Sequence, residues 1–338
     1  MRFDVSNNAS VSGLNDRPMM QKELHPVSEG LREYLLQCHL ERSIPVTYRD
    51  LHHYRYTDAL RDEQGKHTHW ERVIYHDSDF AKLQHQLSTC WQILTGTSLL
   101  EVASVDYCEY ANSMPFRINV RLPDQTATCF YIKTADASRV YGMELDRLLS
   151  DHSLTYLVAG QTLVETHIQG QPVDEWMIQA QGNHQLEKAA AEAFIRFSTY
   201  CLARLLGDMR CYNFVISDTQ FRAIDFDQQS YEGRLHMYWP PFYKENLPLL
   251  HWVNEHLSEF DIQQIKTSEL IRLAERIRSN EQPLRALLRQ MASDELSESY
   301  RIVQLRNDLN EYHHTELFSG CSSMGDLLSA HLNCLIPG

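Results

Sequence analysis

Five short runs of mixed apolar and polar residues between positions 98 and 168 constrain the fold more than any other feature. Their lengths and their β-branched and aromatic content are typical of strands, and turn-forming segments at 111–115 and 123–125 separate the first three. The runs read SLLEVASVDYCEY, FRINVRL, TATCFYIKTA, LTYLVAG and QTLVETHI. An amphipathic helix is expected at 137–151, between the third and fourth runs. This order predicts a small antiparallel lobe of five strands and one helix.

After residue 171 the pattern becomes mainly helical. The segment 184–206, HQLEKAAAEAFIRFSTYCLARLL, carries apolar residues along one face and predicts a long helix. We expect this helix to end at Gly207, because glycine commonly terminates helices. The runs NFVIS and FRAIDF then predict a short hairpin around residues 217–220, and helical periodicity returns from Pro248 onward. A second, mainly helical lobe is therefore expected.

The residues before position 98 read differently from both lobes. The first 18 residues are polar and rich in Ser and Asn, which is typical of a flexible tail. From there to residue 97 the spacing is mostly helical, which predicts a helical extension able to bind a protein partner. We therefore expect an α+β chain with four parts. They are a tail at 1–18, a helical extension at 19–97, a β-rich lobe at 98–170 and a mainly helical lobe at 171–338.

The charge balance excludes some classes of function. The chain has 31 Lys and Arg against 45 Asp and Glu, a net charge of -14, which argues against nucleic-acid wrapping or general attraction to anionic membranes. No apolar stretch approaches the ~20 residues of a membrane span, and the first residues lack a secretory signal. The eight cysteines form no C-x-x-C pair. These features predict a cytoplasmic protein, although exported bacterial effectors often begin with a similarly polar segment.

The segment 207–227, GDMRCYNFVISDTQFRAIDFD, places three metal-compatible polar groups among apolar residues. Asp208 follows the long helix, Asn213 comes five residues later, and Asp225 ends the returning strand of the hairpin. The hairpin should bring Asn213 and Asp225 together, and their oxygens suit Mg²⁺ or Mn²⁺. Asp208 could orient an attacking hydroxyl and accept its proton. Helix capping and turn formation are the alternative roles for such residues.

This segment resembles the catalytic and metal-binding loops of the protein-kinase-like superfamily, especially its aminoglycoside-phosphotransferase and small-molecule kinase branch. The pattern of GD, four residues, Asn and a hairpin ending in AIDFD matches, with Leu206 in place of the usual His. Upstream, CFYIK resembles the third strand of that family, and LVETHIQGQPVDEW resembles its hinge. The resemblance covers approximately residues 98–240. It implies a two-lobed protein-kinase-like fold.

The resemblance also implies how a nucleotide would be held. Lys133 would hold the α- and β-phosphates of ATP, and Glu144 in the following helix would pair with that lysine. Arg147 in the same helix is an equally good ion-pair partner for Glu144. The backbone around the hinge residues Glu165, His167 and Ile168 would hydrogen-bond an adenine ring.

The activity implied is phosphoryl transfer from ATP to a hydroxyl of a small molecule or protein, in a cleft between the lobes. Asp208 and Lys133 would be the catalytic residues, and Asn213 and Asp225 would hold Mg²⁺ or Mn²⁺. The sequence leaves two alternatives open. They are AMP transfer to a protein, and a pseudokinase that binds a nucleotide or partner without turnover. The second alternative arises because no glycine lies between Gly96 and Gly142, where ordinary kinases have a phosphate-covering loop.

Overall fold

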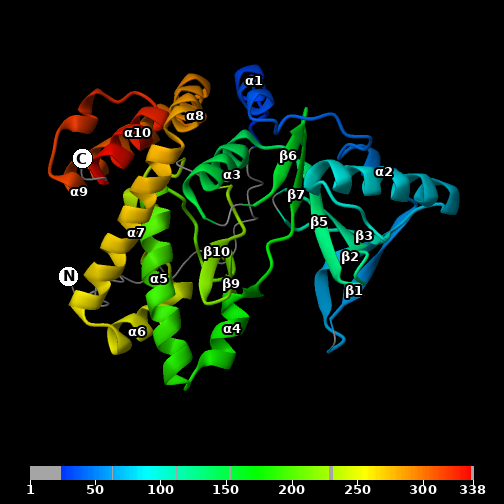
Figure 1. The fold of residues 1–338 in the computed structure, drawn as a ribbon, viewed down its shortest axis with the longest axis horizontal. Helices are drawn as coiled ribbons and strands as arrows, with labels where there is room; N and C mark the ends of the chain where they lie inside the picture. The colour runs from blue at the N-terminus through cyan, green and yellow to red at the C-terminus, as the bar shows by residue number, and fades with distance from the viewer. Residues whose placement is uncertain (1–23, 63, 112, 152–153, 228–230, 336–338) are drawn as a thin grey trace. The chain divides into compact units, whose positions relative to one another are not determined.

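The computed structural model describes residues 24–62, 64–111, 113–151, 154–227 and 231–335 (Figure 1). The fold is α+β, with a seven-stranded antiparallel sheet and a separate group of helices. Contacts divide the described residues into two compact units. The sheet unit contains 24–140 and 154–167, and the helical unit contains 141–151 and 168–335. The tail predicted at 1–18 lies outside the described residues.

The sheet unit is built on seven antiparallel strands in the order β1-β2-β3-β4-β5-β7-β6. Five of them fall in the five predicted runs, which confirms that part of the prediction. These five are β3 (Glu101–Tyr107), β4 (Phe116–Arg121), β5 (Ala127–Thr134), β6 (Tyr156–Ala159) and β7 (Thr162–Thr166). The predicted helix between β5 and β6 is α3 (Ala137–Leu149), which starts in the sheet unit and continues in the helical unit.

The helical prediction for 19–97 is wrong over its middle part. α1 (Glu29–Gln37) and α2 (Asp77–Thr95) are helices, but β1 (Tyr56–Arg61) and β2 (His67–Ile74) form an antiparallel hairpin between them. β2 pairs with β3, so this hairpin extends the predicted sheet. Most side chains of β1 and β2 are exposed or half-buried. They therefore lack the strong apolar alternation that identifies a strand, and pairing with β3 determines their conformation.

The segment predicted as an extension shares its core with the sheet. α2 lies over one face of the sheet (Figure 1), and its fully buried Leu87 belongs to the same apolar cluster as Phe130 and Ile132 of β5. Successive residues of a strand point to opposite faces, so Tyr131 and Lys133 lie on the face away from α2. A boundary at residue 97 therefore does not separate two folded parts.

The helical unit surrounds a small three-stranded sheet. Its strands are β8 (Gln171–Pro172), β9 (Phe214–Ser217) and β10 (Gln220–Ala223), and β9 and β10 form the predicted hairpin. Its helices after α3 are α4 (Val173–Ala180), α5 (His184–Arg204), α6 (Leu247–His256), α7 (Glu259–Ser279), α8 (Glu281–Asp294), α9 (Ser299–His313) and α10 (Met324–Leu335). The 3-10 turns of the two units are η2 (Asp50–His52), η3 (Leu235–Tyr238), η4 (Pro240–Phe242), η5 (Lys244–Asn246) and η6 (Leu317–Gly320).

The long helix α5 does not end at Gly207 as predicted. It ends at Arg204, and Leu205 adopts the left-handed conformation that caps it, with a φ of 55°. The N–H of Leu205 bonds to the carbonyls of Cys201 and Leu202, and its side chain is fully buried. Burial of this apolar side chain offsets the backbone strain, so a leucine takes the place expected of glycine.

None of the helices within the described ranges combines the length and the apolar character needed to cross a membrane.

We predict that Leu87→Ala destabilises the protein by about 2–5 kcal/mol, because it opens a cavity in the core shared by α2 and the sheet. Leu36→Ala is the matched control, since Leu36 is 60% exposed on α1 and should cost less than about 0.5 kcal/mol. Denaturant unfolding measures both. Equal, small effects for the two variants would show that α2 is not part of the sheet core.

Candidate active site

Hydrogen bonds connect the loop after α5 to the β9–β10 hairpin. The side-chain Nδ2 of Asn213 donates to the backbone carbonyl of Asp208 at 2.8 Å. The carbonyl of Asn213 in turn accepts from the N–H of Ile224 at 3.0 Å. Asp225 follows Ile224 directly, and its Oδ1 accepts from the N–H of Asp227 at 3.1 Å. The three predicted residues of this motif therefore belong to one hydrogen-bonded segment of the helical unit.

The hairpin register explains why Asn213 lies opposite the residue before Asp225. Asp218 and Thr219 form its two-residue turn, and both have positive φ values, 50° and 68°. Two left-handed residues give the type I′ turn that matches the twist of a two-stranded ribbon. Ser217 then pairs with Gln220, and the ladder continues to Phe214 opposite Ala223. One step further along the ribbon lie Asn213 and Ile224.

The loop is braced from the segment that follows the hairpin. The backbone of Asp208 is left-handed, with a φ of 53°, and its N–H donates to the hydroxyl of Tyr243 at 2.8 Å. The Tyr243 hydroxyl donates to the carbonyl of Met237, and Asn246 Nδ2 donates to the carbonyl of Met209 at 2.8 Å. Leu206, just before this loop, is fully buried. Sequence reasoning missed the bracing roles of Tyr243 and Asn246.

The environment of Asp208 makes its carboxyl a weak acid. Burial raises the pKa of Asp208 to about 6, and the nearby carboxylates of Asp225, Glu232 and Glu245 act in the same direction. The guanidinium of Arg210 opposes this rise, with its Nε 2.9 Å from Oδ1 of Asp208. A carboxyl that changes protonation state near neutral pH is suited to exchange a proton with a bound hydroxyl.

The donor chemistry at this site fits a hard divalent cation. No group of three or more His, Cys, Asp or Glu side chains within the described residues could enclose a metal ion. Mg²⁺, however, is commonly held by one or two protein oxygens together with waters and the phosphates of a bound nucleotide. The side chains of Asn213 and Asp225 carry oxygens of this type.

Lys133 is a buried residue of the sheet unit with a firmly placed ammonium group. Its Nζ lies 2.5 Å from Oε1 of Glu165, and the guanidinium of Arg139 also binds this carboxylate. Burial opposes the ionisation of Glu165, but Arg139 and Lys133 outweigh it and lower its pKa. Glu165 therefore acts through its side chain, in an ion pair that the sequence did not reveal.

Most backbone N–H and C=O groups of the predicted adenine-binding hinge already take part in hydrogen bonds within the sheet. Glu165 lies in β7 and pairs with Tyr131 of β5 on one side and with Tyr156 of β6 on the other. The N–H of His167 donates to the carbonyl of Cys129 at 3.3 Å. Of the three predicted contacts, only Ile168 has no backbone hydrogen bond among those described.

Glu144 has an ion-pair partner within its own helix. Both carboxylate oxygens accept hydrogen bonds from Arg147, at 2.7 and 2.6 Å, and Glu144 is fully buried. Residues three apart face each other on a helix, which explains this pairing. Arg147, one of the two partners considered from the sequence, therefore neutralises Glu144.

Comparisons with known proteins add a weak structural likeness. The sequence matches no family model and no curated protein. Among solved structures, the chain is similar to the open conformation of CtTel1, with a TM-score of 0.44 and 10% sequence identity. The match covers 90% of this chain and 14% of that one, so the chain spans a small part of the length of CtTel1. A likeness at this level carries no argument about function.

We predict that Asp208→Asn stabilises the protein at neutral pH. Because burial raises the folded-state pKa of Asp208 to about 6, ionisation of its carboxyl costs folding free energy. Wild type therefore loses stability as pH rises from the unfolded-state pKa of 3.8 through about 6. Relative to wild type, the variant should gain on the order of 1–3 kcal/mol between about pH 4 and pH 6, then stay level to pH 8. Denaturant unfolding across this pH range is the measurement.

The control for that prediction is Asp218→Asn, which removes a carboxylate from the exposed turn of the same hairpin. Its effect should stay below about 0.5 kcal/mol throughout. A pH-independent difference between Asp208→Asn and wild type would contradict the assigned environment of Asp208.

Proposed function

We propose that this chain is a phosphotransferase with a protein-kinase-like fold, which moves the γ-phosphoryl group of ATP to a hydroxyl of a small molecule or a protein. The observation that carries the proposal is the hydrogen-bonded segment of Asp208, Asn213 and Ile224, with Asp225 adjoining it. In this segment a weakly acidic carboxyl lies in the same loop system as two side chains whose oxygens suit a hard cation. Phosphoryl transfer requires this combination because it depends on positioning and charge neutralisation.

Each residue has a separate task in this proposal. Asp208 orients the acceptor hydroxyl and accepts its proton as the new oxygen–phosphorus bond forms, while the bond from the γ-phosphorus to the β–γ bridging oxygen breaks and ADP leaves. Asn213 and Asp225 hold the cation. When bound, Mg²⁺ or Mn²⁺ neutralises charge on the β- and γ-phosphates. The raised pKa of Asp208 supports its task, since a base that titrates near neutral pH can both accept and release a proton.

Lys133 is assigned to the phosphates on the grounds of its chemistry. A buried ammonium can donate up to three hydrogen bonds, and its ion pair with Glu165 fixes its position on β5. Because the Lys133 side chain is ordered before a nucleotide binds, nucleotide binding costs less side-chain entropy. The ion pair described for this lysine is with Glu165, and the predicted pairing with Glu144 stays a prediction.

We predict that two substitutions separate the chemical step from nucleotide binding. Asp208→Asn should bind ATP with Mg²⁺ nearly as well as wild type, yet transfer the phosphoryl group about 10²–10⁴-fold more slowly, because only the base is lost. Asp225→Ala should lose the Mg²⁺-dependent part of ATP binding. Calorimetry with and without EDTA measures binding, and release or transfer of the labelled γ-phosphoryl group measures the reaction.

Asp218→Asn serves again as the control, since it lies in the same hairpin but outside the proposed site. It should match wild type in both measurements. Wild-type transfer by Asp208→Asn, with the chemical step rate-limiting, would identify Asp208 as a structural loop residue. Unchanged Mg²⁺ dependence in Asp225→Ala would remove the metal assignment.

A further inference from the structure

One buried imidazole of the helical unit has no task in the proposed reaction. His331 lies on the C-terminal helix α10 and is fully buried. Its Nε2 lies 3.0 Å from the backbone carbonyl of Leu202, in the last turn of α5. Its Nδ1 lies 2.9 Å from Nε2 of His313, the last residue of α9. Three helices therefore meet at this side chain, just before the loop that carries Asp208.

These contacts determine which nitrogen of each ring carries a hydrogen. A carbonyl only accepts hydrogen bonds, so Nε2 of His331 donates to Leu202. Burial lowers the pKa of His331 to about 3, so its imidazole is neutral near pH 7 and its Nδ1 is an acceptor. Nε2 of His313 therefore donates to His331. Both ring nitrogens of His331 are used, which fixes the orientation of the ring.

The carbonyl of Leu202 belongs to the bend that leads from α5 into the loop. An α-helix leaves its last four carbonyls without partners in the helix. The Leu202 carbonyl accepts from the N–H of Leu205 at 3.2 Å and from His331 at 3.0 Å. Leu205 and Asp208 both have left-handed backbones, with φ values of 55° and 53°, so the bend between them is strained. His331 thus binds the base of a strained segment.

The helix that carries His331 has a fixed position of its own. Gly325, in the first turn of α10, lies so close to α8 that a Cβ there would be 2.6 Å from the backbone nitrogen of Ala292. His313 stacks on Phe318 of η6, with 5.5 Å between ring centroids, between α9 and α10. α10 can therefore support the end of α5.

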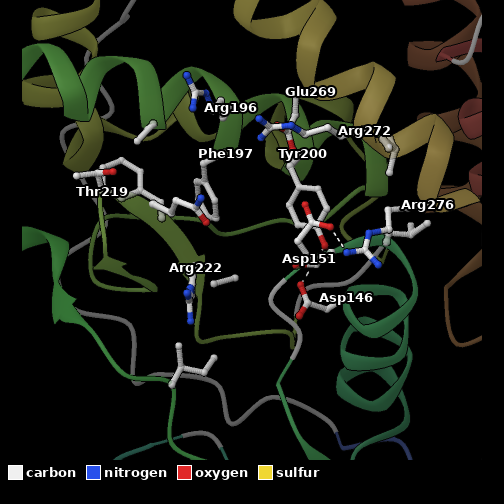
Figure 2. Close-up of a pocket in the computed structure, with 18 residues that line it drawn as sticks. Asp146, Asp151, Arg196, Phe197, Tyr200, Thr219, Arg222, Glu269, Arg272 and Arg276 are labelled. Carbon is white, nitrogen blue, oxygen red and sulfur yellow. Dashed lines mark hydrogen bonds and ion pairs between the residues drawn. The ribbon is translucent and has the colours of Figure 1, made fainter.

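Other contacts hold α5 through its side chains. Tyr200 and Asp146 line a partly open cavity of about 120 Å³ (Figure 2), and the Tyr200 hydroxyl donates to Oδ1 of Asp146 at 3.0 Å. The fully buried Arg204 also binds Asp146, at 2.6 Å. These contacts connect α5 to α3. The contact of His331 differs from them because it binds a backbone carbonyl at the bend.

We propose that His331 is a positioning residue for the candidate active site, which holds the bend before Asp208 in place by donating to the Leu202 carbonyl. The position of the loop matters because a misplacement of about 1 Å can slow a reaction by about 10²-fold. The effect on rate rests on the proposed phosphotransferase function. The effect on the order of the loop rests only on the hydrogen bonds of His331.

The first test compares His331→Leu with His331→Gln by hydrogen exchange of the full chain, measured by mass spectrometry. Leucine donates no hydrogen bond, whereas the amide of glutamine supplies both a donor and an acceptor. In His331→Leu, the segment 203–213 should exchange about threefold to tenfold faster than in wild type, the factor for loss of one net hydrogen bond. In His331→Gln it should exchange as in wild type.

Controls separate the order of the loop from overall stability. Exchange in α7 reports opening of the helical unit as a whole, so in His331→Leu it should rise less than exchange in the segment 203–213. His251→Leu on α6 is the matched control, because it makes the same change in a side chain that is 77% exposed. It should exchange as wild type does. If His331→Leu does not fold, His313→Leu carries the test, since it removes the donor that orients His331 and should also speed exchange in 203–213.

Transfer of the labelled γ-phosphoryl group gives a separate readout. At saturating ATP and Mg²⁺, His331→Leu should be about 10–10²-fold slower than wild type with a smaller change in the KM for ATP, and His331→Gln should recover the rate. Equal acceleration of exchange in 203–213 and α7, or a wild-type transfer rate in His331→Leu, would overturn the positioning role. Selectively faster exchange in 203–213, with no transfer by wild type, would support that role and contradict only the proposed function.

Discussion

The hydrogen bond from the Asn213 side chain to the Asp208 carbonyl is the contact on which the candidate site depends. It closes the loop between α5 and β9, and the bond from the Ile224 N–H to the Asn213 carbonyl extends the connection to the far end of the hairpin. These two bonds connect the loop that carries Asp208 to the residue that precedes Asp225. A short sequence motif thereby becomes a group of polar residues with fixed relative positions.

The loop holds this arrangement through buried polar contacts. The Asp208 N–H and the Met209 carbonyl are bound by Tyr243 and Asn246, and Asn246 is fully buried. Because hydrogen bonds are stronger in a low-dielectric interior, these contacts can hold the strained, left-handed backbone at Asp208. The same partial burial raises the pKa of its carboxyl. Strain and a weakened acid at one residue are features often found together at functional sites.

Much of the fold could be predicted from the sequence, because local pattern and final structure agree over most elements. The strands from β3 to β7 carry apolar and β-branched residues that are buried against α2, so their pattern is strong. The hairpin β1–β2 is largely exposed, and only its pairing to β3 determines its conformation. The cap at Leu205 likewise depends on burial by other elements.

In the candidate site too, some features could be predicted from the sequence, and others depend on contacts between distant segments. Spacing alone placed Asn213 opposite the end of the hairpin, since a two-residue turn fixes the register. Ion pairs between distant segments could not be predicted this way. The pairing of Lys133 with Glu165 joins β5 to β7, and many carboxylates were equally available to that lysine in the sequence.

The measurement that tests the central claim most directly is transfer of label from ATP. The full chain is incubated with a cell lysate and Mg²⁺ or Mn²⁺, in parallel with ATP labelled at the γ- or at the α-phosphate. Phosphoryl transfer predicts that only the γ-label moves to an acceptor and that EDTA stops it. Movement of the α-label would identify AMP transfer. Binding of ATP with no transfer of either label would contradict the account and identify a pseudokinase.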